Sequence, residues 1–388
     1  MRFEPSAEQA LVARTARAFA QDVLLPRAAA RDRAHTFPEE EMRRMAELGL
    51  VGLTVPPSEG GVGMGALAQA EVVAALAEAD ASVAVTLAVT NMVAESLARE
   101  GDAHVKARFL RPLCAGGLVA GAFALSEAGA GSDPAGMRTL CRKHGGGYRL
   151  DGSKQWITSG DRAGVFVVMA RHEGPPGERP RFSAFVLPAG TPGLSVGPPE
   201  NKLGQRGSTT VPLTLEAVDL PAHARLGAEG DGFRIAMAAL DGGRINVAAM
   251  AVGVSRAALG AALAYAQQRE QFGKPLSAFQ AIQVSLADAA TQLEAAWLMV
   301  ARAAWAKDAG LPCTQAAAEA KLFASEAAQR ICDSALQVHG GYGYTREFPV
   351  ERFVRDARVM TIYEGTSQIQ KLVVARHVLQ ALRETQHV

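Results

Sequence analysis

The chain has 388 residues, too many for a single simple core, so two or three domains are expected. Apolar residues make up 48% and charged residues 20%, as in soluble globular proteins, and the net charge is +1. The sequence has no long basic run or Arg-rich arm, which argues against nucleic acid as the main partner. The four cysteines include no C-x-x-C pair, which argues against a disulfide framework or a zinc site and favours a reducing compartment.

Neither a signal peptide nor a membrane span is expected. The first twenty residues mix charges into their apolar positions and so lack the apolar core of a signal peptide. No window reaches about 18 uncharged apolar residues, the length that a membrane-spanning helix needs. We therefore expect a cytoplasmic protein.

Residues 1–118 are predicted to form a helical domain. Apolar residues at helical spacing predict a helix from Ser6 to about Arg31, with a kink or break at Pro26. Further helices are predicted over 37–48, 65–79, 83–99 and 102–113.

Residues 119–228 have the pattern of a β domain. Short β-prone runs alternate with clusters of Gly, Pro and Asp, and no helical crossover separates them, which favours an antiparallel β-sandwich or barrel. Strands are predicted over 120–125, 148–150, 165–170, 182–187 and 211–218.

Residues 229–388 return to helical periodicity and are predicted to form a four-helix bundle with one extra element. Breakers such as Gly273-Lys274-Pro275 separate the long Ala-rich segments. Helices are predicted over 233–268, 279–307, 314–337 and 367–382. The expected fold is thus mostly α, with a central β domain between two helical domains.

Near the C-terminus, Glu364 follows an apolar pair and precedes Gly365. Ser367 and Gln370 have the spacing of a capping box, which predicts a helix start at about Thr366 or Ser367. A carboxylate just before a helix N-terminus lies where anions are favoured. The alternative is an ordinary solvated Glu beside a helix start.

Two motifs in the β domain suggest contact with a flat ligand. FALSEAGAGSD at 123–133 ends a strand in a Gly-rich loop, where backbone N–H groups can approach a flat or phosphorylated molecule. In WITSG at 156–160, Trp156 and Thr158 would share one face of a strand, so a ring could pack on a planar cofactor. The alternatives are a plain surface turn and a core tryptophan.

Three further motifs belong to the C-terminal helices. Asp241 and Arg244, spaced i, i+3, would start a helix, or would form an ordinary surface pair. REQFGKP at 269–275 marks a break between two long helices, and QVHGGYGY at 337–344 has enough glycine to suggest backbone lying close to a ligand. His339 has no second ligand at metal spacing, so it is interpreted as structural and no metal site is expected.

In this order, the six motifs resemble the acyl-CoA dehydrogenase family of flavoproteins over essentially the whole chain. The residues that carry the resemblance are FALSEAGAGSD at 123–133, WITSG at 156–160, LDGGR at 240–244, REQFGKP at 269–275, QVHGGYGY at 337–344 and IYEGTSQIQ at 362–370. The resemblance implies FAD as cofactor, an acyl-CoA as substrate and an electron-transfer flavoprotein as partner. It also implies a homotetramer, a dimer of dimers, with FAD at the subunit interface.

The resemblance also assigns roles to individual residues. Glu364 would be the base that removes the α-proton of the thioester while a hydride leaves the β-carbon for flavin N5, which gives a trans-2-enoyl-CoA. Substrate contacts would be Ser132, Asp241, Arg244 and Gly365. FAD contacts, from the same or the neighbouring subunit, would be Phe123, Leu125, Ser126, Gly131, Ser132, Trp156, Ile157, Thr158, Arg269, Phe272, Gln280, Gln337, Gly340, Gly341, Thr366 and Gln368.

Two departures within the family refine these expectations. Relatives such as isovaleryl-CoA dehydrogenases carry the base on the D-x-x-R helix, where this chain has Gly243, so a short- or medium-chain enzyme for straight acyl groups fits better. Ala128 replaces the usual proline of the Gly-rich loop, which loosens that loop. An acyl-CoA oxidase that uses O₂, or a non-catalytic flavin-containing relative that binds DNA or protein, are the alternatives.

Overall fold

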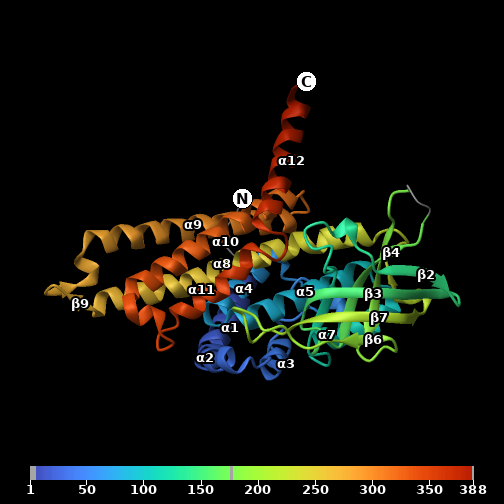
Figure 1. Cartoon of the computed structure of the whole chain (residues 1–388), viewed down its shortest axis with the longest axis horizontal. Helices are drawn as coiled ribbons and strands as arrows, with labels where there is room; N and C mark the ends of the chain where they lie inside the picture. Colours follow the sequence, from blue (N-terminus) through green and yellow to red (C-terminus); the bar gives the residue numbers. More distant parts are fainter. Residues whose placement is uncertain (1–5, 175–177, 387–388) are drawn as a thin grey trace.

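The computed structural model of the chain describes residues 6–174 and 178–386. It is mostly helical, with a β domain between an N-terminal and a C-terminal helical region, which confirms the expected fold class (Figure 1). The outermost predicted domain limits, at residues 1 and 388, lie outside the described residues.

The N-terminal region forms the predicted helices. The expected break near Pro26 is a π-helical turn over Ala20–Leu24, and a second π-helical turn over Lys106–Leu110 interrupts the last helix of the region. The helices are α1 Ala7–Phe19, α2 Leu25–Ala34, α3 Glu39–Glu47, α4 Gly65–Ala79, α5 Ala81–Glu100, α6 Ala103–Val105 and α7 Arg111–Cys114.

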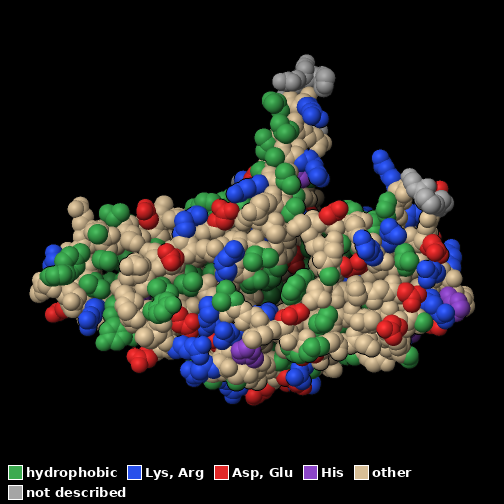
Figure 2. Space-filling view, in the orientation of Figure 1, with side chains coloured by type: hydrophobic (Ala, Val, Ile, Leu, Met, Phe, Trp, Pro, Cys, Tyr) green, Lys and Arg blue, Asp and Glu red, His purple; other side chains and the backbone are tan. Residues whose placement is uncertain are grey.

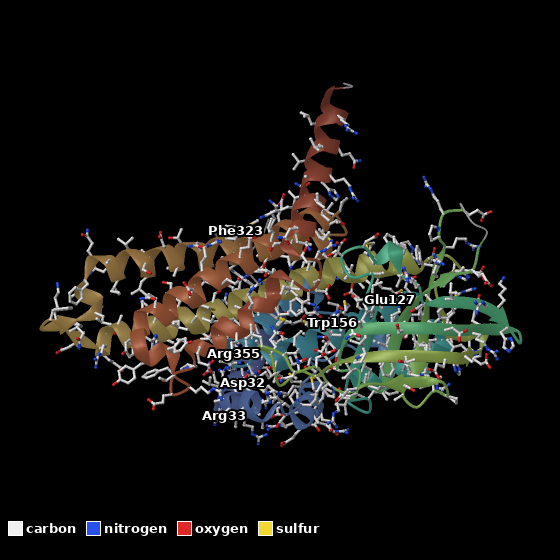
Figure 3. All side chains as sticks on the ribbon, in the orientation of Figure 1. Asp32, Arg33, Glu127, Trp156, Phe323 and Arg355 are labelled. Atoms are coloured by element: carbon white, nitrogen blue, oxygen red, sulfur yellow. The ribbon has the colours of Figure 1, made fainter. Side chains whose placement is uncertain are left out.

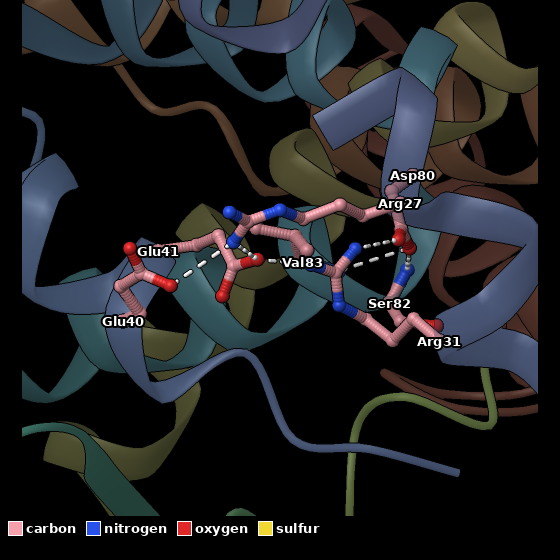
Figure 4. A network of polar contacts seen from close by, with 7 residues as sticks. All are labelled: Arg27, Arg31, Glu40, Glu41, Asp80, Ser82 and Val83. Carbon is pink, nitrogen blue, oxygen red and sulfur yellow. Dashed lines mark hydrogen bonds and ion pairs between the residues drawn. The ribbon is translucent and has the colours of Figure 1, made fainter. Parts of the chain in front are cut away.

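A buried ionic network joins three of these helices (Figure 4). Arg31 of α2 donates to Asp80 at 2.6 Å and also pairs with Glu41 of α3, and all three side chains are almost fully buried. Asp80 in turn caps α5 by accepting from the backbone N–H of Ser82 at 2.9 Å. Because each buried charge has a partner, the network fixes how α2, α3 and α5 pack.

Two helices, α5 and α8 (Gly232–Gln268), are long and apolar enough by composition to cross a membrane. Their most apolar windows are 83% and 67% buried inside the protein, respectively. Both helices therefore pack as core helices here.

The β domain is one continuous sheet that curls around its own apolar core. The strand order is β6-β7-β3-β2-β4-β5-β8, with β1 also paired to β4. The strands are β1 Gly121–Ala124, β2 Leu140–His144, β3 Gly147–Thr158, β4 Val165–His172, β5 Phe182–Pro188, β6 Leu194–Val196, β7 Thr210–Leu220 and β8 Arg225–Leu226.

The sheet differs from the prediction in two respects. Most pairs are antiparallel as expected, but β1 and β2 both pair with β4 in parallel, so the sheet is mixed. Strands β2, β6 and β8 were not predicted: only Cys141 is buried in β2, none of the three residues of β6 is buried, and β8 has two residues. Such strands carry too little apolar pattern to be recognised from sequence.

The C-terminal region is built on three long helices, α8, α9 Gln280–Asp308 and α10 Thr314–His339. A two-stranded hairpin, β9 Glu270–Gln271 and β10 Lys274–Pro275, joins α8 to α9. Helix α11, Val350–Arg358, was not predicted, and α12, Ser367–Gln386, extends away from the body of the molecule (Figure 1). The predicted helix start at Asp241 is wrong, since that residue lies inside α8.

Candidate active site

Glu364 lies on a strained turn between α11 and α12. Glu364 and Gly365 both have left-handed backbone conformations, with φ of 54° and 88°. A non-glycine residue adopts this region at an energetic cost, and such strain gathers at functional sites. The turn aims the carboxylate at α8, where Gly243 leaves room for it: a Cβ at position 243 would lie 2.3 Å from Glu364 Oε2.

One oxygen of the Glu364 carboxylate is buried without a hydrogen-bond partner among the described residues, while the residue as a whole is partly exposed. Within the part of the chain that the structure describes, Glu364 Oε2 is buried and accepts no hydrogen bond. Burial raises the pKa of Glu364 to about 7, and the nearby cations Arg244 and Lys321 only partly oppose this.

The helix cap differs from the prediction. Thr366, not Ser367, caps α12, because its hydroxyl accepts from the backbone N–H of Ile369 at 3.3 Å. The buried Ser367 hydroxyl has no partner among the described residues. Gln370 instead donates from Nε2 to the carbonyl oxygens of Glu364 and Gly365, each at 3.0 Å, and so braces the turn.

Lys321, from α10, holds the same turn from the other side. Its Nζ donates to the Gly365 carbonyl oxygen at 2.6 Å, and the residue is fully buried. Burial lowers the pKa of Lys321 to about 8, although Glu364 opposes the shift. Lys321 was not singled out from the sequence, although a lone lysine among the apolar positions of an Ala-rich helix could have indicated a functional residue.

Asp241 and Arg244 lie one turn apart on α8, close to Glu364. Arg244 Nη1 donates to Asp241 at 2.8 Å, and the Thr314 hydroxyl donates to the other carboxylate oxygen of Asp241 at 2.6 Å. The side chain of Arg244 is 7% exposed, so this is a buried pair rather than the surface pair considered as the alternative.

The β domain contacts the segment that precedes Glu364 through Gln205. Its Nε2 donates to the Tyr363 hydroxyl and to the Asp356 carbonyl oxygen, both at 3.2 Å. Arg355 of α11 also pairs with Asp32 of α2 at 2.7 Å, and both are labelled in Figure 3. Contacts from the β domain and from α2 therefore converge on the segment that precedes Glu364.

The two β-domain motifs are adjacent in the fold. The backbone N–H of Gln155 donates to the Ser126 carbonyl oxygen at 2.9 Å, which joins β3 to the Gly-rich loop. Trp156 lies at the end of β3 that faces the helices (Figure 3) and is 58% exposed, so it is not a core tryptophan. It has φ of 64° at a register shift, which means that the regular strand assumed for Trp156 and Thr158 is broken there.

A second buried lysine anchors this region and was also missed. Lys154 Nζ donates to Glu127 at 2.9 Å and to the Leu125 carbonyl oxygen at 3.0 Å. Glu127 also accepts from the backbone N–H groups of Arg138 and Thr139, at 2.6 and 3.0 Å. Burial opposes ionisation of Glu127, but Lys154 and these donors keep its pKa below the usual value.

Another group of predicted FAD contacts lies at the far end of the long helices, near β9 and away from the β domain (Figure 1), whereas Thr366 and Gln368 lie at the start of α12. Phe272 is 93% exposed, and Arg269 lies over the Tyr342 ring at 5.7 Å. Exposed side chains or backbone are also found at Gln280, Gln337, Gly340 and Gly341. By contrast, the nearby His339 is buried and stacks on Tyr265, which supports its structural interpretation.

Three family models match the chain in order. The N-terminal, middle and C-terminal domains of acyl-CoA dehydrogenases match residues 6–117, 122–218 and 230–379. These ranges follow the predicted domain order, and the predicted limits at 118 and 228 stay predictions.

Full-length relatives agree with these matches. A probable acyl-CoA dehydrogenase of Bacillus subtilis is 43% identical over 98% of this chain and 100% of its own length. The mouse mitochondrial short-chain specific acyl-CoA dehydrogenase is 43% identical over 96% of this chain and 90% of its own.

Solved structures extend the likeness to the fold. Butyryl-CoA dehydrogenase of Megasphaera elsdenii superposes with a TM-score of 0.94, at 41% identity, over 98% of this chain and 100% of its own. Glutaryl-CoA dehydrogenase of Mycobacterium smegmatis, solved with FADH2, gives a TM-score of 0.91 at 30% identity over 96% of this chain and 95% of its own. The chain therefore belongs to the acyl-CoA dehydrogenase family and is an FAD-dependent oxidoreductase that acts on CH–CH bonds of acyl-CoA thioesters.

Proposed function

We propose that Glu364 is the general base that removes the α-proton of the acyl-CoA, so that the product is a trans-2-enoyl-CoA. The observation that carries this proposal is the buried Oε2 of Glu364, which has no partner among the described residues and lies beside the space left by Gly243. A carboxylate that is desolvated and without donors is a stronger base than one in water.

The acid–base properties of the site suit this role. The pKa of Glu364 is raised to about 7, close to neutrality, where a general base is most effective. General-base catalysis typically contributes ~10²–10⁴ in rate. The backbone N–H of Glu364 donates no hydrogen bond within the described residues, so it is free to donate to the thioester oxygen as negative charge develops there.

The β-domain surface fits the isoalloxazine of FAD. Trp156 presents a largely exposed ring, and the neighbouring Thr158 hydroxyl has no partner in the described part of the chain. Side chains added at Gly129 or Gly131 would meet nothing within 4 Å, so the Gly-rich loop is open to a ligand. The chemistry that bound FAD supplies is acceptance, at N5, of the hydride from the β-carbon.

The substrate contacts would come from the two sides of this site. Ser132 is exposed on the Gly-rich loop, and Gly365 is partly exposed beside the base. Asp241 and Arg244 form an ion pair on α8. This pair would fix the side chains on the surface of α8 that contacts the CoA portion. Thr366 and Gln368 would contact FAD at the N-terminus of α12, where negative groups are favoured.

We further propose a homotetramer, a dimer of dimers, in which FAD is shared between subunits. Arg269, Phe272 and Gln280 are exposed at the end of the bundle remote from the β domain, so a neighbouring FAD would be needed to contact them. Helix α12 also exposes Leu372, Val378 and Leu379, an apolar stripe visible in Figure 2. Exposed apolar surface of this kind is typical of protein interfaces.

The electron acceptor proposed is an electron-transfer flavoprotein in the cytoplasm. A chain from a structural study of the electron-transferring flavoprotein of Acidaminococcus fermentans superposes with a TM-score of 0.94 at 39% identity, over 98% of this chain and 100% of its own. The assay is reduction of a purified electron-transfer flavoprotein by the enzyme and acyl-CoA without oxygen. Failure to reduce any such acceptor would remove this part of the proposal.

The test of the reaction is anaerobic bleaching of the bound flavin by short- and medium-chain acyl-CoAs. Glu364→Gln should keep its yellow FAD and lose nearly all turnover, because the amide cannot accept the proton. A Glu364→Gln variant with the wild-type rate would place the base elsewhere.

A second candidate is the reverse reaction, reduction of an enoyl-CoA. The observation that favours it is 42% identity to the acryloyl-CoA reductase (NADH) of Anaerotignum propionicum, over 98% of this chain and 96% of that protein. Loss of NADH in the presence of an enoyl-CoA would support this direction. Peroxide release under air would instead support an acyl-CoA oxidase, and a salt-sensitive gel shift would support a DNA-binding relative.

A further inference from the structure

Lys321 is a cation in the core of the protein that pairs with no carboxylate among the described residues. It lies on α10 among buried alanines at positions 317, 324 and 328, and it is fully buried. Its one hydrogen bond in the described part of the chain is to the Gly365 carbonyl oxygen at 2.6 Å. No carboxylate oxygen of a described residue lies within ion-pair distance of its Nζ.

A buried lysine of this kind is costly to the fold. Removing an ammonium group from water is strongly unfavourable unless a partner compensates for the lost hydration. The charged groups that face Lys321 are Glu364, Arg244 and Glu326. Of these, Glu326 is engaged by Lys371 at 3.6 Å, and Arg244 has the same sign of charge, so the favourable partner that remains is the base.

The two cations beside Glu364 differ in how much charge they offer it. Arg244 is paired with Asp241 at 2.8 Å, so the carboxylate of Asp241 offsets much of its positive charge. Lys321 has no such companion within the described structure. The groups that act on Glu364 from the elements packed against it are Arg244 of α8 and Lys321 of α10.

We propose that Lys321 is a positioning residue for the catalytic base: its ammonium group fixes the turn that carries Glu364, through the Gly365 carbonyl, and favours the carboxylate form of Glu364. The inference rests on the proposed function, since it takes Glu364 as the base. It requires that the lysine act by charge as well as by hydrogen bonding, which distinguishes it from a purely structural role.

The kinetic test compares FAD-loaded wild type with Lys321→Met, Lys321→Arg and the control Lys106→Met, which removes a part-buried lysine paired with Glu59 in the N-terminal region. The measurement is the rate of anaerobic flavin bleaching by butyryl-CoA from pH 5.5 to 9. Lys321→Met should shift the acidic limb of the pH–rate profile to higher pH by about one unit. The variant should therefore be about tenfold slower than wild type at low pH and equal to it above pH 8. Lys321→Arg and Lys106→Met should keep the wild-type limb.

An unchanged acidic limb in Lys321→Met would overturn the proposal, whether or not the rate falls. A rate that drops by the same factor at every pH marks a structural role only. If Lys321→Met does not retain FAD, Lys321→Gln is measured in its place and judged by the same limb.

A second measurement does not depend on turnover. Melting temperatures of wild type, Lys321→Met, Glu364→Gln and the double variant form a mutant cycle, measured at pH 8 and pH 5. At pH 8 Lys321→Met should lower the melting temperature more in the wild-type background than in the Glu364→Gln background, because the base is then ionised. At pH 5 Glu364 is protonated, so Lys321→Met should lower the melting temperature equally in the wild-type and Glu364→Gln backgrounds.

The cycle also separates the two proposals. The coupling is the difference between the effects of Lys321→Met on the melting temperature in the wild-type and Glu364→Gln backgrounds. A coupling that is the same at pH 8 and at pH 5 would overturn the role of Lys321 even if Glu364 is the base. Coupling that appears only at pH 8, with Glu364→Gln fully active, would overturn the role of Glu364 while leaving its interaction with Lys321 standing.

Discussion

Two lysines are fully buried in this protein, and each lies beside a carboxylate, but the two sites are built in opposite ways. Lys154 donates to Glu127, and Glu127 also receives two backbone N–H groups. Lys321 donates only to a backbone carbonyl in the described structure, and the nearby Glu364 has a buried oxygen with no donor. Satisfied hydrogen bonds and a direct ion pair make the first site a clamp.

The difference appears in the two carboxylates. The pKa of Glu127 lies below its ordinary value despite burial, because one cation and several donors favour the charged form. The pKa of Glu364 is raised to about 7, because burial is met only by cations at a distance. The pKa of a buried carboxylate therefore depends on the donors that the fold supplies, and the described part of this chain contains one carboxylate with donors and one without.

The largest expected effect is at the clamp. Lys154→Met leaves Glu127 buried without its cation, which should cost about 3–5 kcal/mol in the free energy of unfolding and weaken FAD binding through the Leu125 loop. Urea unfolding and flavin content measure both effects.

The matched control for this prediction is the double variant Lys154→Met with Glu127→Gln. Because it removes both charges, it should recover part of the lost stability. A double variant that is no more stable than Lys154→Met would show that the ion pair does not dominate at this site.

The next largest effect is expected at the site of Glu364 and Lys321. Gly243→Ala places a methyl group where Glu364 Oε2 lies, 2.3 Å away, so the carboxylate must move and flavin reduction by butyryl-CoA should slow about 10–100-fold. Gly242→Ala, on the same helix, meets the flexible end of Lys307 at 2.7 Å and a carboxylate oxygen of Glu95 at 3.6 Å, both remote from Glu364, and should keep the rate. Equal rates for the two variants would mean that the carboxylate position is not restricted by α8.

The pH dependence should distinguish the two carboxylates. If Glu364 is the base, as proposed, it acts only when ionised; its pKa is about 7, so below pH 7 the bleaching rate should fall about tenfold per pH unit. Glu127 has a pKa below its ordinary value and stays ionised over this range, so it contributes no step. A rate that is constant from pH 7 down to pH 5 would contradict the raised pKa of Glu364.

The smallest expected effect is at the cap of α12. Thr366→Ala removes the bond to the Ile369 N–H and should cost about 1 kcal/mol of stability, seen as a lower melting temperature. Ser367→Ala removes a buried hydroxyl that has no partner among the described residues, so it should cost less. The opposite order would restore the capping box that the sequence suggested.

Local pattern was enough to predict the domain order and the strongest motifs. Helix α4 has the predicted limits, and Gly365 with the Ser367–Gln370 spacing marked a turn before a helix at Glu364, although only the family resemblance gave that residue a role. The contacts that control the site could not be predicted in the same way. Lys321 and Gly365 are 44 residues apart, and Lys154 and Glu127 are 27 apart, so only the tertiary fold brings them together. Strand β2 was missed because its apolar content is too low.

The space at Gly243 also constrains how sequences of this kind can diverge. A side chain at position 243 and the carboxylate of Glu364 compete for the same space, so a substitution at position 243 must displace the carboxylate. The effect of a substitution at either position should therefore depend on the residue at the other position.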